Sequence, residues 1–329
     1  MRWRVALAAV SVVGLVAVGC GDDGSDESGA TTTTNGTAAT SEAPGEPDVG
    51  SGDGISAEEL GRARNAVLPD PAEIEEVARS YCEAWNAPRD VDAMVAMMTD
   101  DVVIYDGLTG ERHEGPDQAA AYIESTSAEI DTGDCGPAFV GGDWVAGTYT
   151  LSSTGTGAGA EGISAVRILD GKVDWHLAFY TLSEAAQAPD EGSLVSGSTA
   201  ALRYCEAFAD PAHDADVILA TMTSEPQIYG IPNGFSAVGE DAVRRMIDTQ
   251  VVPSDVNTCG GTGSEGPVGT LDHGGWQAGV SATVNETYGL WLEGVSVMEI
   301  VDDKVNRHFL QTSTFDGADE FGDLWGVTG

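Results

Sequence analysis

Apolar residues near the start of the globular part of the chain recur at helical spacing. Ile74, Val77 and Tyr81 fall three or four positions apart, so their side chains would share one face of a helix. Asp70 and Pro71 stand just before them. This pair is typical of a helix start, because Asp caps free backbone N–H groups and Pro suits the first turn. The pattern predicts an amphipathic helix that begins at residue 71.

The next segments predict a short helix, a strand, a third helix and then a run of strands. We expect these elements at 91–98, at 102–106, from residue 116 onward, and at 138–140, 143–152, 163–169 and 172–182. Asp170-Gly171, between the last two strands, is typical of a tight hairpin. Helices followed by antiparallel strands indicate an α+β fold, with the helices packed on one face of a curved antiparallel sheet. Such a cone-shaped domain would hold an apolar cavity at its mouth.

The whole pattern occurs twice. Tyr81-Cys82-Glu83-Ala84-Trp85 returns as Tyr204-Cys205-Glu206-Ala207-Phe208. Further pairs in register are Met98 with Met222, Tyr105 with Tyr229, Gly115 with Gly239, Cys135 with Cys259, Trp144 with Trp276, Lys172 with Lys304 and His176 with His308. A repeat this long is a tandem domain, since solenoid units are far shorter. We therefore predict two tandem cone-shaped domains, at residues 55–190 and 191–329.

An apolar run opens the chain. It follows Arg2 and Arg4 and is short for a membrane span, which is typical of an export signal. The run ends in the letters LVAVGC, which resemble a bacterial lipobox. The resemblance implies a signal peptide at residues 1–20 and lipidation of Cys20, with the protein anchored to the outer face of the bacterial cell membrane. Ordinary cleavage near Gly19 and an uncleaved anchor are the alternatives.

Residues 21–54 are rich in small and acidic side chains and hold hardly an aliphatic one. Such a segment cannot bury enough apolar surface to offset its ordering entropy, so we expect a disordered tether. The full chain has 54 acidic against 14 basic residues, a net charge of −40. This charge argues against nucleic-acid binding, which needs clustered Lys and Arg, and against adhesion to anionic lipid. Solubility is its simplest explanation.

Four cysteines remain once Cys20 is set aside, and an exported chain with an even number usually forms disulfides. Of the three connectivities, the repeat favours Cys82–Cys135 and Cys205–Cys259, one in each domain. Each would close a loop of about 54 residues, which stabilises a fold by roughly 4 kcal/mol in the chain-entropy model. We expect no metal, because no His/Cys cluster has ligand spacing.

Two stretches carry a resemblance to a known family. Residues 81–110, YCEAWNAPRDVDAMVAMMTDDVVIYDGLTG, resemble the start of the SnoaL-like domains, and DGKVDWHLAFY resembles their closing hairpin. These domains belong to the nuclear-transport-factor-two-like superfamily, with the ketosteroid isomerases and polyketide cyclases. The resemblance covers residues 70–185 and 193–316 and implies the cone fold. It implies the fold more strongly than any activity, because one fold hosts many functions.

The resemblance also implies candidate catalytic residues. Ketosteroid isomerases use a first-helix Tyr as oxyanion donor and an Asp at the end of the first strand as base; these positions fall on Tyr81 and Asp106. A second acid of that family falls near Ser164 and is missing here. A carboxylate at a cavity mouth can abstract a proton next to a carbonyl, and a phenol can stabilise the enolate. His176 is a further candidate acid or base.

Each candidate has a structural alternative. Tyr81 fits a buried helix face, Asp106 fits an Asx turn, and His176 fits a hydrogen-bonded core position. The second copy keeps the Tyr and the His but has Gly230 in place of Asp106. The positions that we expect to line ligand cavities are Trp85, Tyr105, Ser164, Tyr204 and His308.

Three functions remain open at this point. We expect an exported, lipid-anchored protein that binds a small hydrophobic molecule or mediates an interaction at the cell envelope. The alternative is an isomerase or cyclase that uses Asp106 as general base and Tyr81 as oxyanion donor on a ketone-bearing substrate. A third is pairing of sheet faces, between the two copies or in a homodimer. Walker, Rossmann, GxSxG and HExxH patterns are absent, so we expect no cofactor.

Overall fold

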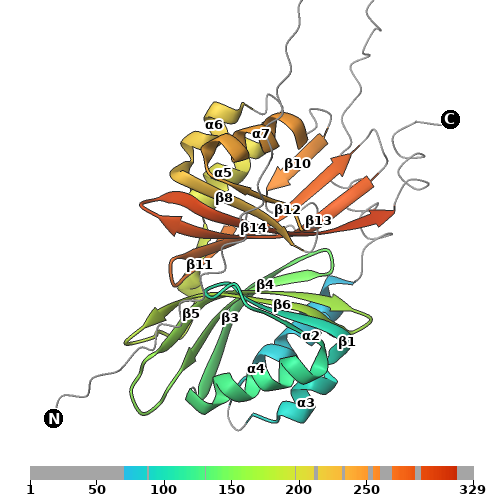
Figure 1. Ribbon diagram of the computed structural model, residues 1–329, viewed down its shortest axis with the longest axis vertical. Coiled ribbons are helices and arrows are strands. Elements are labelled where there is room, and N and C mark those ends of the chain that lie inside the picture. The colour runs from blue at the N-terminus through green and yellow to red at the C-terminus, as the bar shows by residue number, and fades with distance from the viewer. Residues whose placement is uncertain are drawn as a thin grey trace, which may run out of the picture. The chain divides into compact units, whose positions relative to one another are not determined.

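The computed structural model describes residues 70–86, 89–129, 131–196, 198–210, 214–231, 234–250, 255–259, 269–285 and 290–316. These residues form an α+β protein with two sheets, each preceded by helices (Figure 1). The predicted export signal, Cys20 and the predicted tether lie outside the described residues. Within the described ranges, no helix combines the length and the apolar character that a membrane span requires.

The first half of the structure runs from α2 to β6. Its helices are α2 (Pro71–Glu83), α3 (Val91–Ala96) and α4 (Gly115–Glu129). Its strands are β1 (Met98–Asp106), β2 (Arg112–Glu114), β3 (Thr132–Gly141), β4 (Trp144–Ser152), β5 (Gly159–Leu169) and β6 (Lys172–Ser183). They form one sheet in the order β2-β1-β6-β5-β4-β3.

The second half repeats this arrangement from β7 to β14. Its helices are α5 (Ala200–Ala209), α6 (Ala215–Ala220) and α7 (Glu240–Gln250). Its strands are β7 (Leu194–Ser196), β8 (Met222–Ile231), β9 (Ser236–Val238), β10 (Asp255–Cys259), β11 (Gly269–His273), β12 (Trp276–Asn285), β13 (Leu290–Val301) and β14 (Lys304–Asp316). The sheet order is β7-β11-β12-β13-β14-β8-β9, and β10 also pairs with β12. Strands β10 and β11 thus take the place of the single strand β3.

The prediction of purely antiparallel sheets is wrong in one respect. Strand β1 pairs with β6 in parallel, with Ile104 opposite His176, and β8 pairs with β14 in parallel, with Ile228 opposite His308. The other strand pairs are antiparallel. Hairpins between consecutive strands leave a turn signal in the sequence. The pairing of β1 with β6 does not, because a helix and four strands separate them.

Local signals at the element ends are confirmed with one adjustment. Asp70 caps α2, since its Oδ1 accepts a 2.9 Å hydrogen bond from the N–H of Ala72. The turn between β5 and β6 holds Asp170 at φ 51° and Gly171 at φ 72°, the left-handed conformation that an Asp-Gly turn favours. Helix α3 ends at Ala96, so Met98 starts β1 and does not end the helix as predicted.

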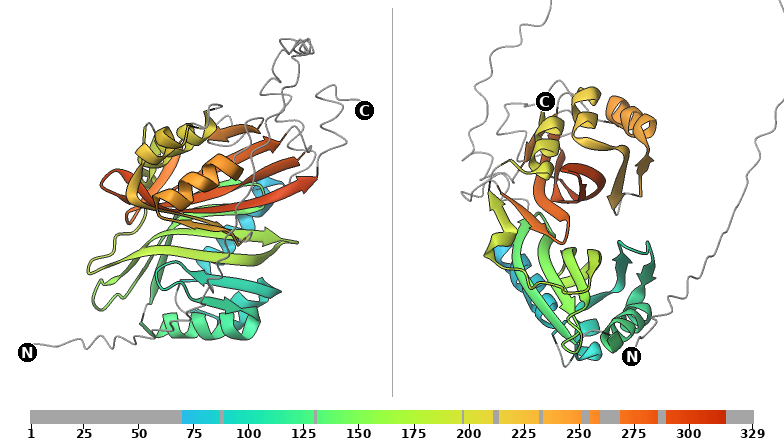
Figure 2. Two further views of the ribbon diagram at one scale, coloured as in Figure 1. Left: turned by 45° about the horizontal axis from the view of Figure 1, so that its top comes forward. Right: turned by 90° about the vertical axis from the view of Figure 1, so that its left-hand side faces the viewer.

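Each half buries its helices against one face of a curved sheet (Figure 2). Tyr81, Ile104 and Ile123 belong to the first of these cores. The other faces of the sheets contribute to a further buried cluster, which includes Phe179 and Phe309. Since neighbouring residues of a strand point to opposite faces, this division decides which side chains can reach a cavity under the helices.

Candidate functional site

The first half holds a cavity of about 560 Å³ between its helices and its sheet. This volume lies within the range of small-molecule sites. Helices α2 and α4 and strands β1, β3, β4, β5 and β6 all contribute to its wall. The apolar part of the wall includes Ala78, Val145, Leu151, Ala160, Val166, Ala178 and Leu182. Polar side chains lie among these residues, and they decide what the cavity can recognise.

Asp106 is the buried carboxylate of the cavity, with 5% of its surface exposed. Its Oδ1 accepts hydrogen bonds from the backbone N–H groups of Leu108 and Thr109, both at 2.9 Å. Its Oδ2 accepts from the hydroxyl of Tyr180 at 2.8 Å and from that of Tyr122 at 3.4 Å. The Asx-turn interpretation is therefore correct for Oδ1 of Asp106. The other oxygen belongs to a cluster with two phenols that also line the cavity.

Tyr122 and Tyr180 hold their protons firmly. Burial raises the pKa of both phenols well above the usual value, and the neighbouring Asp106 raises it further. Both therefore act as hydrogen-bond donors to the carboxylate over the physiological range. Because each hydroxyl hydrogen points at Asp106, the lone pairs of the two phenol oxygens remain as acceptors.

Tyr81 is engaged elsewhere in the same cavity. Its hydroxyl lies 3.0 Å from Nδ1 of His176, and both side chains are buried. Burial lowers the pKa of His176 to about 4, partly opposed by the charge of Asp106. The imidazole is therefore neutral at pH 7. Burial likewise raises the pKa of Tyr81, so the pair is a neutral hydrogen bond.

The second half contains the same pair. The hydroxyl of Tyr204 lies 2.8 Å from Nδ1 of His308, whose Nε2 lies 3.1 Å from the hydroxyl oxygen of Ser296. Burial lowers the pKa of His308 to about 3. Since this pair occurs in both halves, it is best explained as a link between the first helix and the last strand of each half.

Aromatic rings surround the polar group. Trp85 lies edge-to-face with Tyr81, Tyr122 and His176, at centroid distances of 6.3, 6.5 and 5.8 Å. Tyr149 also lines the cavity, and burial raises its pKa well above the usual value. The cavity therefore combines apolar walls, several ring faces and edges, and the buried carboxylate of Asp106.

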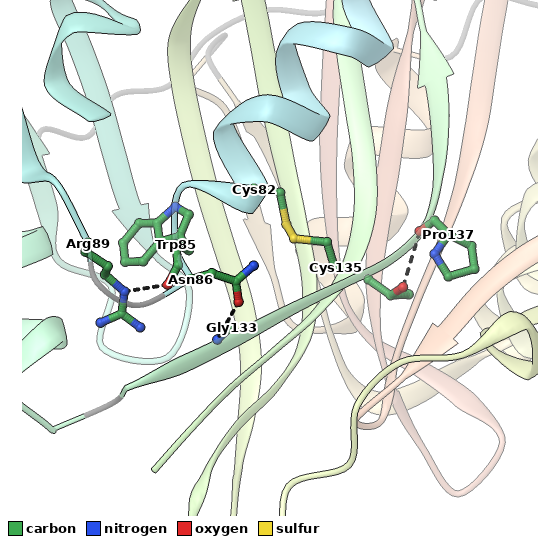
Figure 3. The surroundings of a disulfide bond; sticks show 8 residues. Cys82, Trp85, Asn86, Arg89, Gly133, Cys135 and Pro137 are labelled. Atoms are coloured by element: carbon green, nitrogen blue, oxygen red, sulfur yellow. Dashed lines mark hydrogen bonds between the residues drawn. A yellow bond between two sulfur atoms is a disulfide. The ribbon is translucent and has the colours of Figure 1, made fainter. Parts of the chain in front are cut away.

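A disulfide ties the helix of the cavity to its sheet (Figure 3). The predicted Cys82–Cys135 bond is present, with the Cα atoms 6.2 Å apart, and it joins α2 to β3. Beside it, the side-chain oxygen of Asn86 accepts a 3.2 Å hydrogen bond from the N–H of Gly133. Cys205 is also disulfide-bonded. The side chain of its predicted partner, Cys259, lies outside what the structure describes.

The two halves differ at the polar cluster. Strand register and helix position align Asp106, Tyr122, Tyr149 and Tyr180 with Gly230, Met246, Ser281 and Thr312. The ring of Phe235 occupies the space beside Gly230, where a Cβ atom would overlap it. The second half has thus replaced the carboxylate and the phenols together, while it keeps the Tyr–His pair.

The structure brings most of the predicted first-half residues together. Tyr81, Trp85, Asp106, Ser164 and His176 all line the one cavity. Tyr204 and His308 form the buried pair of the second half.

One residue needs a correction. Tyr105 lies on the opposite face of β1 from Asp106, with its ring 6.5 Å from those of Phe179 and Phe309. The prediction that Tyr105 lines the cavity is wrong, because neighbouring strand residues point to opposite faces.

Sequence reasoning overlooked the partners of Asp106. Tyr180 follows His176 and Ala178 in alternation on β6, so its place on the cavity face was readable from the sequence. For Tyr122 the sequence indicated only a place on a predicted helix and gave no sign of its contact with Asp106. Over the described ranges, no three His, Cys, Asp or Glu side chains gather as a metal site would require.

Comparisons with known proteins support the fold. A family model described as SnoaL-like domain matches residues 78–176. No curated protein sequence matches the chain. Similar solved structures include an NTF-2 like protein of unknown function from Burkholderia xenovorans, at 22% identity over 36% of this chain and 88% of that chain, with a TM-score of 0.30. A SnoaL-like protein of unknown function from Burkholderia thailandensis has 22% identity over 34% of this chain and 98% of that chain, with a TM-score of 0.30.

A putative ketosteroid isomerase from Kribbella flavida is also similar, with 19% identity over 39% of this chain and 92% of that chain and a TM-score of 0.31. Likeness at this level transfers no activity. The family model covers Tyr81, Asp106, Tyr122 and His176. The match to the SnoaL-like domain thus spans residues 78–176, and most of the residues that line the cavity fall within it.

Proposed function

We propose that the first half is a binding module for a small, largely apolar molecule whose polar group is held at Asp106. One observation carries this proposal. The cluster of Asp106, Tyr122 and Tyr180 lines a cavity of about 560 Å³, and the second half lacks the whole cluster. Side chains that were needed only for the fold would be expected in both copies.

The physical cost of the cluster supports a ligand-binding role. Burying a carboxylate costs several kcal/mol of lost hydration unless hydrogen bonds and charges compensate for it. At the matching place the second half puts Gly230 and the ring of Phe235, which carry no such cost. The fold can therefore place apolar groups at this position instead of a carboxylate. We attribute the retained carboxylate to recognition.

The same geometry favours binding over isomerase chemistry. That alternative needs donors free to stabilise an oxyanion. The hydroxyl of Tyr81 is paired with His176, and the second half preserves this pair. The phenols of Tyr122 and Tyr180 donate to Asp106, and Ser164 stands at the position of the missing acid. The cluster around Asp106 therefore offers acceptors more readily than donors.

We propose in addition that Cys20 carries a lipid anchor. The LVAVGC segment and the disulfide Cys82–Cys135, which fits an oxidising compartment, support this. In a bacterial host the wild type should fractionate with membranes, and Cys20→Ser should be released into the soluble fraction. An unmodified N-terminal Cys20 peptide in the mass spectrum of wild type would contradict the anchor.

The binding function is tested with a neutral apolar dye such as Nile red. We expect dye fluorescence to rise on addition of the full chain, with one site per chain. Ala138 is exposed and lines the cavity, so Ala138→Trp should narrow it and weaken dye binding about tenfold. Ala121 is exposed on α4 and does not line the cavity, so Ala121→Trp is the matched control. No binding, or equal binding by both variants, would contradict the proposal.

A further inference from the structure

We infer that the ligand of this cavity is an organic ammonium ion: a protonated amine on an apolar body. The inference rests on the proposed binding function and specifies its ligand class. It follows from the charge of Asp106, the direction of the hydrogen bonds around it, and the aromatic side chains that line the same space.

The charge of Asp106 has no counter-ion among the described residues. Four neutral groups donate to it, two backbone N–H groups and two phenols, which is the pattern of an ionised carboxylate. No Lys, Arg or His of the described ranges lies within ion-pair distance of it. Hydrogen bonds spread a negative charge but do not cancel it. A cation in the cavity would supply the missing partner.

The hydrogen-bond directions select a donor ligand. The hydroxyl groups of Tyr122 and Tyr180 both donate their hydrogen bonds to Oδ2 of Asp106. The four donors already occupy the lone pairs of the carboxylate, so the acceptors that remain at this end of the cavity are the two phenol oxygens. A protonated amine can donate N–H groups to both phenol oxygens while its positive charge lies beside Asp106. A ketone or a carboxylate would instead present its own acceptors to them.

The aromatic side chains suit a cation as well. Trp85, Tyr122, Tyr149 and Tyr180 all line the cavity, and ring faces attract cations that approach within about 6 Å. His176 is neutral at pH 7, since burial lowers its pKa to about 4, and so does not repel a cation. The guanidinium of Arg89 lies 5.6 Å from the Trp85 ring, and Arg89 is not part of the cavity lining.

The remaining charged residues around the cavity also favour a cationic ligand. Glu75, Asp134 and Arg79 belong to its lining. The side chain of Arg79 is 60% exposed and forms an ion pair with Glu75. The local balance is therefore negative even before Asp106 is counted. The net charge of −40 on the chain would further concentrate cations near the opening, most strongly at low salt.

Three probes of one shape test the inference by calorimetry on the full chain at pH 7. They are cyclohexylmethylamine, cyclohexylmethanol and cyclohexanecarboxylate, which are cationic, neutral and anionic. We expect the amine to bind at least tenfold more tightly than the alcohol, and the carboxylate to bind least. Raising the salt concentration should weaken the amine more than the alcohol.

Variants locate the effect. Asp106→Asn should remove the tenfold preference for the amine over the alcohol. Asp117→Asn alters an exposed acid on α4 outside the cavity lining and should keep the preference. Tyr180→Phe retains the carboxylate and removes one acceptor, so it should weaken the amine about threefold. It also provides an answer if Asp106→Asn does not fold, which circular dichroism would reveal.

The outcomes separate the two proposals. If the alcohol binds as tightly as the amine, or Asp106→Asn keeps the preference, the ammonium inference is overturned and the binding function stands. If the neutral dye binds and none of the three probes does, the inference is again overturned alone. If neither the dye nor any probe binds, both proposals fail.

Discussion

The hydroxyl of Tyr180 donates a 2.8 Å hydrogen bond to Oδ2 of Asp106. Asp106 ends β1, and Tyr180 lies near the end of the neighbouring parallel strand β6, so the bond ties β6 to β1 at the cavity. In the second half, Thr312 and Gly230 occupy these positions, and no such bond can form. This one relationship distinguishes two otherwise similar halves.

The contribution of this bond to stability can be measured by removing the hydroxyl of Tyr180. Tyr180→Phe should lower the free energy of unfolding by about 1–3 kcal/mol, because a buried carboxylate loses a donor. Tyr149→Phe is the control, since no hydrogen bond of its hydroxyl to the described residues is present, and it should change stability by less than about 0.5 kcal/mol. Urea denaturation measures both. Equal effects would show that the Tyr180 bond contributes nothing specific.

The buried histidines predict a loss of stability in acid. An unfolded His titrates near pH 6.5, whereas burial lowers the pKa of His176 to about 4 and that of His308 to about 3. Their contribution is therefore complete above pH 6.5 and is lost as the pH falls toward 4 and then 3. For His176 the total is on the order of 3 kcal/mol.

The test compares wild type with His176→Gln. Both proteins contain the same carboxylates, so the pH dependence that these groups cause cancels in the difference between the two stabilities. Between pH 7 and pH 4.5 the stability advantage of wild type should shrink by on the order of 2–3 kcal/mol. Chemical denaturation at both pH values gives the result. An advantage that stays constant would mean that His176 titrates normally in the folded protein.

The disulfide Cys82–Cys135 should account for much of the stability of the first half. Replacing both cysteines by Ser should lower the free energy of unfolding by roughly 4 kcal/mol, because the bond closes a loop across a sequence separation of 53. Urea denaturation of the variant and of wild type measures the loss. A loss below about 1 kcal/mol would show that contacts between α2 and β3 suffice without the bond.

The pairing of the second disulfide stays a prediction. Cys205 is disulfide-bonded, and the repeat makes Cys259 the expected partner. Mass spectrometry of a non-reduced digest should yield a peptide that links these two cysteines. A peptide linking Cys82 to Cys205 would overturn both pairings.

Gly230 should tolerate no side chain. A Cβ atom there would overlap the ring of Phe235, so Gly230→Ala should destabilise the protein by about 1–3 kcal/mol. Adding Phe235→Leu should recover part of the loss. Gly279 is the control, because a Cβ atom there would meet only Thr270, at 4.0 Å. If Gly230→Ala and Gly279→Ala have equal thermal stability, Phe235 does not fill the site as described.

Proton exchange tests the isomerase alternative directly. We expect the wild type to exchange the α-protons of a small cyclic ketone no faster than Asp106→Asn does. The reason is that Tyr81 is paired with His176 and the other phenols donate to Asp106. Deuterium incorporation followed by NMR gives the rates. A wild-type rate a hundredfold above that of the variant would restore Asp106 as a general base.

Local patterns predicted much of the fold. Helical spacing and an Asp-Pro start placed α2, an Asp-Gly pair placed the turn between β5 and β6, and the doubled Tyr-Cys-Glu-Ala motif revealed the repeat. The repeat also selected the Cys82–Cys135 pairing that the structure contains. These features are readable because each depends on residues that are near in sequence or on a comparison of two copies.

The sequence by itself determined the α+β class, the doubling and the candidate residues on the first helix and the strands. Tertiary structure decided which face of the sheet the helices cover, so that Asp106 lines the cavity and Tyr105 does not. It also decided the partners of Asp106, since Tyr122 and Tyr180 lie 16 and 74 residues away along the chain. Such contacts exist only once β1, α4 and β6 have packed together, and no local pattern encodes that meeting.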